Sequence, residues 1–331
     1  FGSYKGDNGL VYFDLNDFDE AVLAPACWEL VRFLASVLAG AAGLKLEPAE
    51  AVSLCVSFLD AYAAALAEGK ARWVERDTAE GLVKDLLDSL RGRLRPTYLD
   101  TRTELRGGKR RLRTDGRKAL PATDRQREQI GEFMAAFART QPDARFYKVL
   151  DVARRIAGTG SLGVDRYVVL VAGKGSPDGN YLIDLKPALP SCLAPHLAQA
   201  QPRWPDEAER VVAVQRRMQA VPTAFLHAVT VGKAPFVLRA LQPSEDRVEL
   251  ERWDGKLRRA AGVMKTMAEA VAWGQLRSGG RQGSAIADEL IDFAGRGGWR
   301  ERLLEAARQA ADQVERDWRE YCAAYRDGAF G

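Results

Sequence analysis

The sequence predicts an α+β protein in which a β-rich segment lies between two helical segments. Apolar residues recur at helical spacing in residues 26–67, whereas strand-like runs separated by turn residues occupy residues 149–241. Helical spacing returns from residue 256 onward. We therefore expect three segments. Residues 1–145 form a helical segment with a first strand and a basic loop, residues 146–250 form a β-rich segment, and residues 251–331 form a second helical segment.

The first segment begins with a strand and continues with helices. LVYFDL at residues 10–15 is rich in aromatic and branched residues, as strands are. Proline stands before or at the start of the next two periodic runs, where helices tolerate it. Residues 92–123 combine Gly, Pro and charge without a clear period, which predicts a long loop or a short irregular strand pair. The expected helices are residues 26–42, 49–67, 78–91 and 124–139.

The middle segment is predicted to hold five strands and one amphipathic helix, and the last segment only helices. The strands are expected at residues 149–156, 166–171, 181–185, 225–231 and 235–241. The helix of the middle segment is expected at residues 206–219, and the final helices at 256–277, 284–294 and 299–326.

Composition excludes several classes of protein. Of the 331 residues, 47% are hydrophobic and 28% charged, which excludes a wholly disordered, collagen-like or coiled-coil chain. No run approaches 18 uncharged apolar residues, so no membrane span is expected. The four cysteines form no CxxC pair, and this favours a reducing, cytoplasmic location over a disulfide scaffold or zinc ribbon. Only two histidines are present, which argues against His-rich metal chemistry.

Positive charge is concentrated in residues 91–118. That window holds eleven Lys or Arg against three acidic residues, although the whole chain carries a net charge of only +4. Arginine suits phosphate, so Arg110, Arg111 and Arg113 are candidates for binding an acidic or phosphorylated substrate. The alternatives are a solvated loop and a nucleic-acid surface, although Tyr98 is the only aromatic residue available for base stacking.

A glycine-rich loop joins the first two strands of the middle segment. Gly158, Gly160 and Gly163, with Ser161, lie in GTGSLG. A strand follows this loop, whereas a helix would follow it in a dinucleotide-binding unit. Strand, glycine loop and strand are the elements that cover the phosphates in protein kinases, where amides must approach phosphate without a Cβ in the way. An ordinary glycine-rich hairpin turn is the alternative.

The next elements follow the order found in kinases. Lys186 ends the third strand, where kinases carry the lysine that contacts the α- and β-phosphates. Helix 206–219 follows and carries Glu207 and Glu209, one of which would pair with that lysine. Residues 236–243 then run from a strand into a linker that would be the adenine-binding hinge.

Acidic residues gather at the end of the first strand. Asp14, Asp17 and Asp19 lie within a short stretch there, and carboxylates in this arrangement suit Mg²⁺. We therefore expect Asp17 to hold the metal, with Asp19 or Asp14 assisting. Helix capping and loop solvation are the alternative roles for these side chains.

Four segments resemble DUF2252, a bacterial family of uncharacterised proteins. They are FDLNDFDEAVLAP-x-x-WEL-x-RF, DVARRIAGTGSLG-x-x-x-YVVL, LKPALPS and RVV-x-x-QRRMQ, and the likeness spans most of the chain, including TRTELRGGKRRLR. The family is similar to aminoglycoside and choline kinases in a G-D-x-H-x-x-N loop, which implies a catalytic Asp and a metal-binding Asn. In the family pattern that loop runs into the residues that stand here as Phe1 and Gly2, so the catalytic residues are expected upstream of Phe1.

The order of these motifs predicts a protein-kinase-like two-lobed fold that is circularly permuted. The expected function is ATP- and Mg²⁺-dependent phosphoryl transfer to an unknown small-molecule or protein acceptor, and the chain as given is expected to lack transfer activity without the upstream loop. The alternatives are a nucleotide-binding pseudokinase or regulator, and a nucleic-acid-binding protein that uses the basic window.

Overall fold

The computed structural model describes residues 1–158 and 163–329, and these residues form two compact units. The first unit comprises residues 1–22, 75–77 and 86–247 and contains the main sheet; the second comprises residues 23–74, 78–85 and 248 onward and is helical. Helices and antiparallel sheets together confirm the α+β class. The sheet-bearing unit includes residues 1–22 and 86–145, which the three-segment organisation had placed in a helical part.

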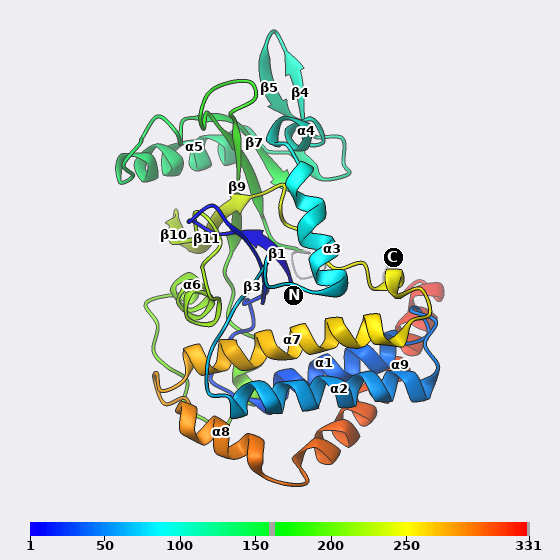
Figure 1. The fold of residues 1–331 in the computed structure, drawn as a ribbon. Coiled ribbons are helices and arrows are strands. Elements are labelled where there is room, and N and C mark those ends of the chain that lie inside the picture. The colour runs from blue at the N-terminus through cyan, green and yellow to red at the C-terminus, as the bar shows by residue number, and fades with distance from the viewer. Residues whose placement is uncertain (159–162, 330–331) are drawn as a thin grey trace. The chain divides into compact units, whose positions relative to one another are not determined.

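A six-stranded antiparallel sheet is the frame of the first unit (Figure 1). Its strands lie in the order β10-β11-β9-β8-β7-β6, so the three strands β7, β8 and β9 are neighbours in space as in sequence. Their bounds are Ala119–Pro121 for β6, Val149–Arg155 for β7, Tyr167–Val171 for β8, Tyr181–Pro187 for β9, His227–Val231 for β10 and Ala234–Leu241 for β11.

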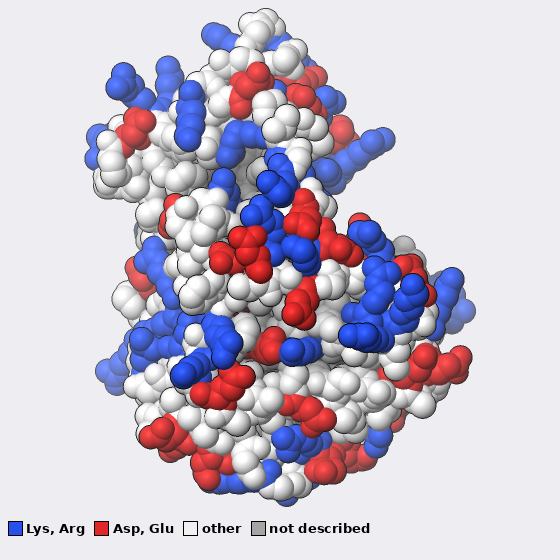
Figure 2. All heavy atoms as spheres, in the orientation of Figure 1, with Lys and Arg blue, Asp and Glu red and all other residues white. Residues whose placement is uncertain are grey.

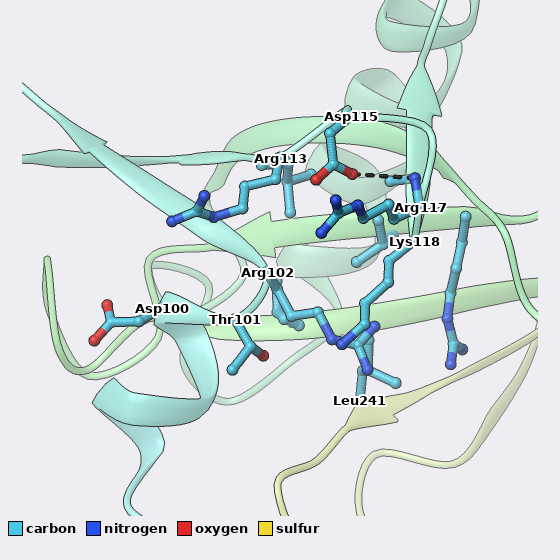
Figure 3. Close-up of a pocket in the computed structure, with 13 residues that line it drawn as sticks. Asp100, Thr101, Arg102, Arg113, Asp115, Arg117, Lys118 and Leu241 are labelled. Carbon is cyan, nitrogen blue, oxygen red and sulfur yellow. Dashed lines mark hydrogen bonds between the residues drawn. The ribbon is translucent and has the colours of Figure 1, made fainter.

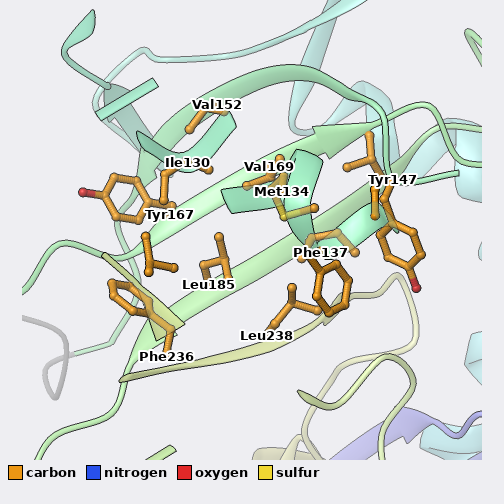
Figure 4. Close-up of a cluster of buried hydrophobic side chains, with 14 of the residues drawn as sticks. Ile130, Met134, Phe137, Tyr147, Val152, Tyr167, Val169, Leu185, Phe236 and Leu238 are labelled. Atoms are coloured by element: carbon orange, nitrogen blue, oxygen red, sulfur yellow. The ribbon is translucent and has the colours of Figure 1, made fainter. Parts of the chain in front are cut away.

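Helix α5 (Asp124–Arg139) covers one face of this sheet. Ile130, Met134 and Phe137 recur at helical spacing and are buried against sheet residues such as Val169 and Leu185 (Figure 4). Thr123 caps the helix by accepting a hydrogen bond from the Gln126 amide at 3.2 Å. This face of the sheet is therefore packed as an apolar core.

The opposite face of the sheet carries the polar residues. Along β9, Asp184 and Lys186 point to this face, whereas Ile183 and Leu185 point into the apolar core, because successive strand residues point to opposite faces. Two smaller apolar clusters cover the ends of this polar face. One includes residues from α4 (Arg95–Asp100) and β5 (Lys109–Leu112), and the other includes residues from α6 (Glu207–Met218).

The N-terminal hairpin is joined to the sheet-bearing unit by long-range hydrogen bonds. Strands β1 (Gly2–Lys5) and β2 (Val11–Asp14) pair antiparallel. The hydroxyl of Tyr4, which is fully buried, donates to the Val221 carbonyl at 2.9 Å, and the Lys5 amide donates to the Gln242 side chain at 2.6 Å. The chain therefore returns, more than 200 residues later, to β1, which pairs with the strand that leads into the acidic segment, residues 14–20.

The second unit is built from long helices. They are α1 (Cys27–Gly40), α2 (Pro48–Ala67), α7 (Leu257–Ser278), α8 (Ala287–Gly295) and α9 (Trp299–Arg326). A polar chain lies in their core: the Tyr62 hydroxyl donates to Gln275, whose amide donates to the Glu29 carboxylate. Burial raises the pKa of Glu29, and the hydrogen bond from Gln275 partly offsets that effect.

Among the described helices, α2 is long and apolar enough to cross a membrane by length and composition, and half of that apolar window is buried in the structure. Core helices of soluble proteins pass the same test. The expectation that the chain has no membrane span stays a prediction.

The remaining elements are β3 (Val74–Glu75), α3 (Gly81–Ser89) and β4 (Thr103–Arg106), with short 3₁₀ turns at Leu90–Gly92, Ala194–His196 and Leu250–Trp253. Of the two forms expected for residues 92–123, a long loop or a short strand pair, the structure contains the strand pair together with further elements. Residues 92–123 contain α4, the β4–β5 hairpin and the edge strand β6. The hairpin turns at Gly107 and Gly108, whose positive φ angles of 56° and 72° favour glycine.

Candidate functional site

Lys186, on the polar face of the sheet, contacts the acidic segment that follows the N-terminal hairpin. The Lys186 ammonium donates a hydrogen bond to the Asp19 carboxylate, and the two residues are 167 positions apart in the sequence. Both side chains remain partly open to solvent, with 22% of Lys186 and 36% of Asp19 exposed. The pair is thus accessible to a ligand.

Two contacts fix the segment that carries Asp19. Phe18 is buried beside Ala208 and Val211 of α6. Arg210 of α6 is also buried, and its guanidinium donates to the main-chain carbonyls of Asp19 at 2.8 Å and Ala21 at 2.6 Å. Sequence reasoning missed Arg210, which holds the acidic segment in place, although it begins the RVV-x-x-QRRMQ motif.

The same arginine joins α6 to the chain beyond β9. Its guanidinium also donates to the Leu189 carbonyl at 2.9 Å and to the Glu207 carboxylate at 2.5 Å. Arg210 therefore connects three segments that surround the Lys186–Asp19 pair.

Glu20 is engaged as a structural acceptor beside the pair. Its carboxylate accepts hydrogen bonds from the Ser191 hydroxyl and the Cys192 amide, both at 2.8 Å. Burial would raise the pKa of Glu20, but these hydrogen bonds and the charge of Arg210 outweigh it and lower the pKa. Glu20 thus ties the acidic segment to the LKPALPS segment in its ionised form.

The three expected metal ligands have different surroundings. The buried carboxylate of Asp14 accepts hydrogen bonds from the Leu15 and Ala220 amides at 2.8 and 3.1 Å. Asp17 is exposed, whereas Asp19 pairs with Lys186. Within residues 1–158 and 163–329, no group of three or more His, Cys, Asp or Glu side chains is arranged to hold a metal.

The glycine loop joins β7 to β8 at the end of the sheet near Lys186, because Tyr167 at the start of β8 lies opposite Leu185. Gly158 and Gly163 have positive φ angles of 65° and 78°, and a Cβ at either position would meet no atom within 4 Å. The backbone conformation at these two positions favours glycine, and the space where a Cβ would lie is open. Gly160 and Ser161 lie outside the described residues.

Glu209 is exposed in the first turn of α6, and its amide donates to the Asp206 carboxylate at 2.9 Å. The partner of Lys186 in the structure is Asp19. The acidic segment of the N-terminal hairpin therefore supplies the carboxylate that sequence reasoning had sought on helix 206–219.

A buried charge cluster lies next to Lys186 on the same face of β9. Asp184 is fully buried, and Arg166 binds it with two hydrogen bonds, from Nε at 2.9 Å and from Nη2 at 2.5 Å. Arg155 Nη1 lies 2.8 Å and Arg239 Nε 3.5 Å from the same carboxylate. Burial alone would raise the pKa of Asp184, but the three guanidinium groups lower it strongly.

The three arginines of the basic window have different environments. Arg110 is buried, and its guanidinium donates to the Pro177 carbonyl at 2.7 Å, the Asp100 carboxylate at 2.6 Å and the Asp178 carboxylate at 3.1 Å. Arg111 is exposed and donates to the Leu150 carbonyl at 2.7 Å. Arg113 donates to the Thr103 carbonyl at 2.9 Å and lines a cavity.

Because Arg110 holds two loops together, we expect Arg110→Ala to lower the free energy of unfolding of the sheet-bearing unit by roughly 3 kcal/mol. Arg111→Ala is the matched control, because an exposed guanidinium with one main-chain contact contributes under about 1 kcal/mol. Urea unfolding followed by circular dichroism measures both variants. Equal effects would show that Arg110 has no special structural role.

The comparisons with known proteins identify the family. Residues 1–324 match the family described as "Uncharacterized protein conserved in bacteria (DUF2252)", so the chain belongs to that family. No curated protein and no solved structure matches the chain.

Proposed function

We propose that this member of the DUF2252 family is an ATP- and Mg²⁺-dependent phosphotransferase with a kinase-like, circularly permuted fold. The observation that carries the proposal is the pair formed by Lys186 and Asp19. This pair joins a lysine on the third strand of the β7–β8–β9 run to a carboxylate of the Asp17-Phe18-Asp19 segment near the N-terminus.

The order of elements around the pair supports this proposal. The glycine loop lies between the first two strands of the β7–β8–β9 run, Lys186 is on the third, and α6 follows before β10. Protein kinases use the same order, with a glycine-rich loop, a lysine on the third strand and a helix after it. Phe18 packing against α6 gives the Asp-Phe-Asp segment a fixed place near the lysine.

The chemistry of the pair suits a nucleotide with its metal. An ammonium group would neutralise phosphate oxygens, and Mg²⁺ takes one or two protein carboxylates together with phosphate oxygens and water. Asp19 and the exposed Asp17 are oxygen donors of the right kind, so the residues fit the ion. When bound, Mg²⁺ would neutralise charge on the phosphates. Lys186 would orient them, and Arg210 would hold the main chain of Asp19 in place.

One feature departs from the kinase pattern. The alternation V-A-I-K places alanine two residues before the lysine, whereas Asp184 stands there with its three arginines. A buried cluster of charges therefore lies beside the lysine, where that pattern has a small apolar residue. Binding of ATP without transfer to any acceptor would favour the regulator alternative.

The experiment is a calorimetric titration of the full chain with ATP, with and without Mg²⁺. We expect Mg²⁺ to strengthen ATP binding to the wild-type protein and to have no such effect on Asp19→Asn, because the variant lacks the metal-binding carboxylate. Asp312→Asn, which changes an exposed carboxylate on α9, is the control and should behave as wild type. Absence of ATP binding to the wild-type protein at millimolar concentrations would refute the proposal.

A further inference from the structure

A cavity of about 370 Å³ lies within the sheet-bearing unit, on the same face of the sheet as Lys186. Its floor is apolar and includes Val168, Leu182 and Leu241. Its rim is strongly basic, and we call the whole site the basic pocket. The cations of the rim are Arg102, Arg113, Arg117, Lys118 and Arg155. Figure 2 shows Lys and Arg side chains around a recess beside α4.

The rim comes from segments that are separate in the sequence. Arg102 precedes β4, whereas Arg117 and Lys118 precede β6. Figure 3 shows the side chains of Arg102 and Lys118 extending toward one another above Leu241. The fold thus concentrates positive charge over an apolar surface.

The two acidic residues of the pocket, Asp100 and Asp115, offset only part of the positive charge of its five cations. Asp100 pairs with Arg110, 2.6 Å away, and Asp115 accepts a hydrogen bond from the main-chain amide of Arg117 at 3.1 Å. In the described ranges, neither Arg102 nor Lys118 forms an ion pair, and the buried Nε of Arg102 has no hydrogen-bond partner. A buried donor without a partner is costly, and a bound acceptor would remove that cost.

Electrostatics agree with this geometry. The charge of Arg102 and then burial lower the pKa of Lys118, and together they outweigh the nearby charge of Asp115, which raises it. Two cations that repel each other across a cavity are stabilised when an anion lies between them.

We propose that the basic pocket binds a small organic phosphate, whose phosphate group contacts Arg102 and Lys118 and whose apolar body lies on Val168, Leu182 and Leu241. The volume suits a small molecule, since ligand cavities usually hold about 300–1,000 Å³. The lining contains no aromatic side chain on which a base of a nucleic-acid strand could stack. A small phosphate ester therefore fits better than a polynucleotide.

This site is distinct from the proposed nucleotide site. Leu182 lies four residues before Lys186 on β9, which places the two positions about 13 Å apart along the strand. Arg155 lines the pocket and also contacts Asp184, so it belongs to both regions.

Phenyl phosphate is the probe, because it combines a phosphate with an apolar ring. Calorimetry should detect its binding to the full chain at low salt, with inorganic phosphate binding more weakly and phenol not binding. Arg102→Gln and Lys118→Gln should each weaken phenyl phosphate binding at least tenfold. Arg125→Gln, at an exposed position on α5, is the matched control and should leave it unchanged.

Two results would overturn the assignment. One is phenyl phosphate affinity that is the same in wild type, Arg102→Gln and Lys118→Gln, with thermal unfolding confirming that all three are folded. The other is tighter binding of a single-stranded oligonucleotide that competes with phenyl phosphate and weakens steeply with salt. Lys186→Met should retain phenyl phosphate binding, which separates this test from that of the proposed function.

Discussion

Replacing Lys186 by methionine is expected to weaken Mg²⁺–ATP binding roughly 10- to 100-fold, because a hydrogen bond to a charged group contributes about 1.5–3 kcal/mol. Methionine keeps much of the length and apolar stem of the side chain but removes the charge. Asp19 would then lose its partner and stand as a carboxylate facing the phosphates. Isothermal calorimetry at saturating Mg²⁺ measures the effect.

Lys174→Met is the matched control for this variant. Lys174 is an exposed lysine in the turn between β8 and β9, at the opposite end of β9 from Lys186. The control should bind Mg²⁺–ATP as wild type does. If both variants lost the same affinity, the loss would reflect net charge and not the position of Lys186.

Replacing Asp184 by asparagine is expected to destabilise the sheet-bearing unit by about 3–5 kcal/mol at neutral pH, because it leaves buried guanidinium groups without their counter-ion. Asp184 is fully buried, and Arg155, Arg166 and Arg239 all lie within 3.5 Å of its carboxylate. Asp178→Asn is the control. Its carboxylate is 66% exposed in its pair with Arg110, so its effect should be under about 1 kcal/mol.

The difference between wild type and Asp184→Asn should also depend on pH. The pKa of Asp184 is lowered in the folded protein, so its stabilising effect is fully present above the unfolded pKa of about 4 and is lost as pH falls below it. Urea unfolding at pH 7 and pH 3 measures this change. A difference that stays constant between these pH values would contradict the ionised state of Asp184.

Local patterns predicted most of the elements. Helix α5 begins after a capping residue and has apolar residues at helical spacing. Strands β7, β8 and β9 are runs rich in β-branched residues between turn residues. These elements could be predicted because their signals lie in the nearby sequence. The N-terminal strand β1 was missed because its pairing depends on β2 and on distant partners such as Ser244. The short helix α4 was missed because its charged sequence has no apolar period.

Local patterns also predicted part of the candidate site. Lys186 stands out at the end of a strand and Asp19 in the acidic segment after another, and the structure brings them together. In the sequence, Asp184 is one polar residue in an otherwise apolar strand. Nothing in the local sequence indicates that three arginines contact it: Arg155 of β7, Arg239 of β11 and Arg166, which directly precedes β8. Such cross-strand clusters depend on sheet order, which sequence periodicity does not specify.

A double-mutant cycle on Mg²⁺–ATP affinity tests the central claim most directly, since it asks whether Lys186 and Asp19 act on one ligand. Calorimetry would compare wild type, Lys186→Met, Asp19→Asn and the double variant. We predict that each single change weakens binding and that the two effects are not additive, with a coupling of at least about 0.5 kcal/mol. Unchanged affinity in all four proteins, or strictly additive losses, would contradict a shared nucleotide and metal site.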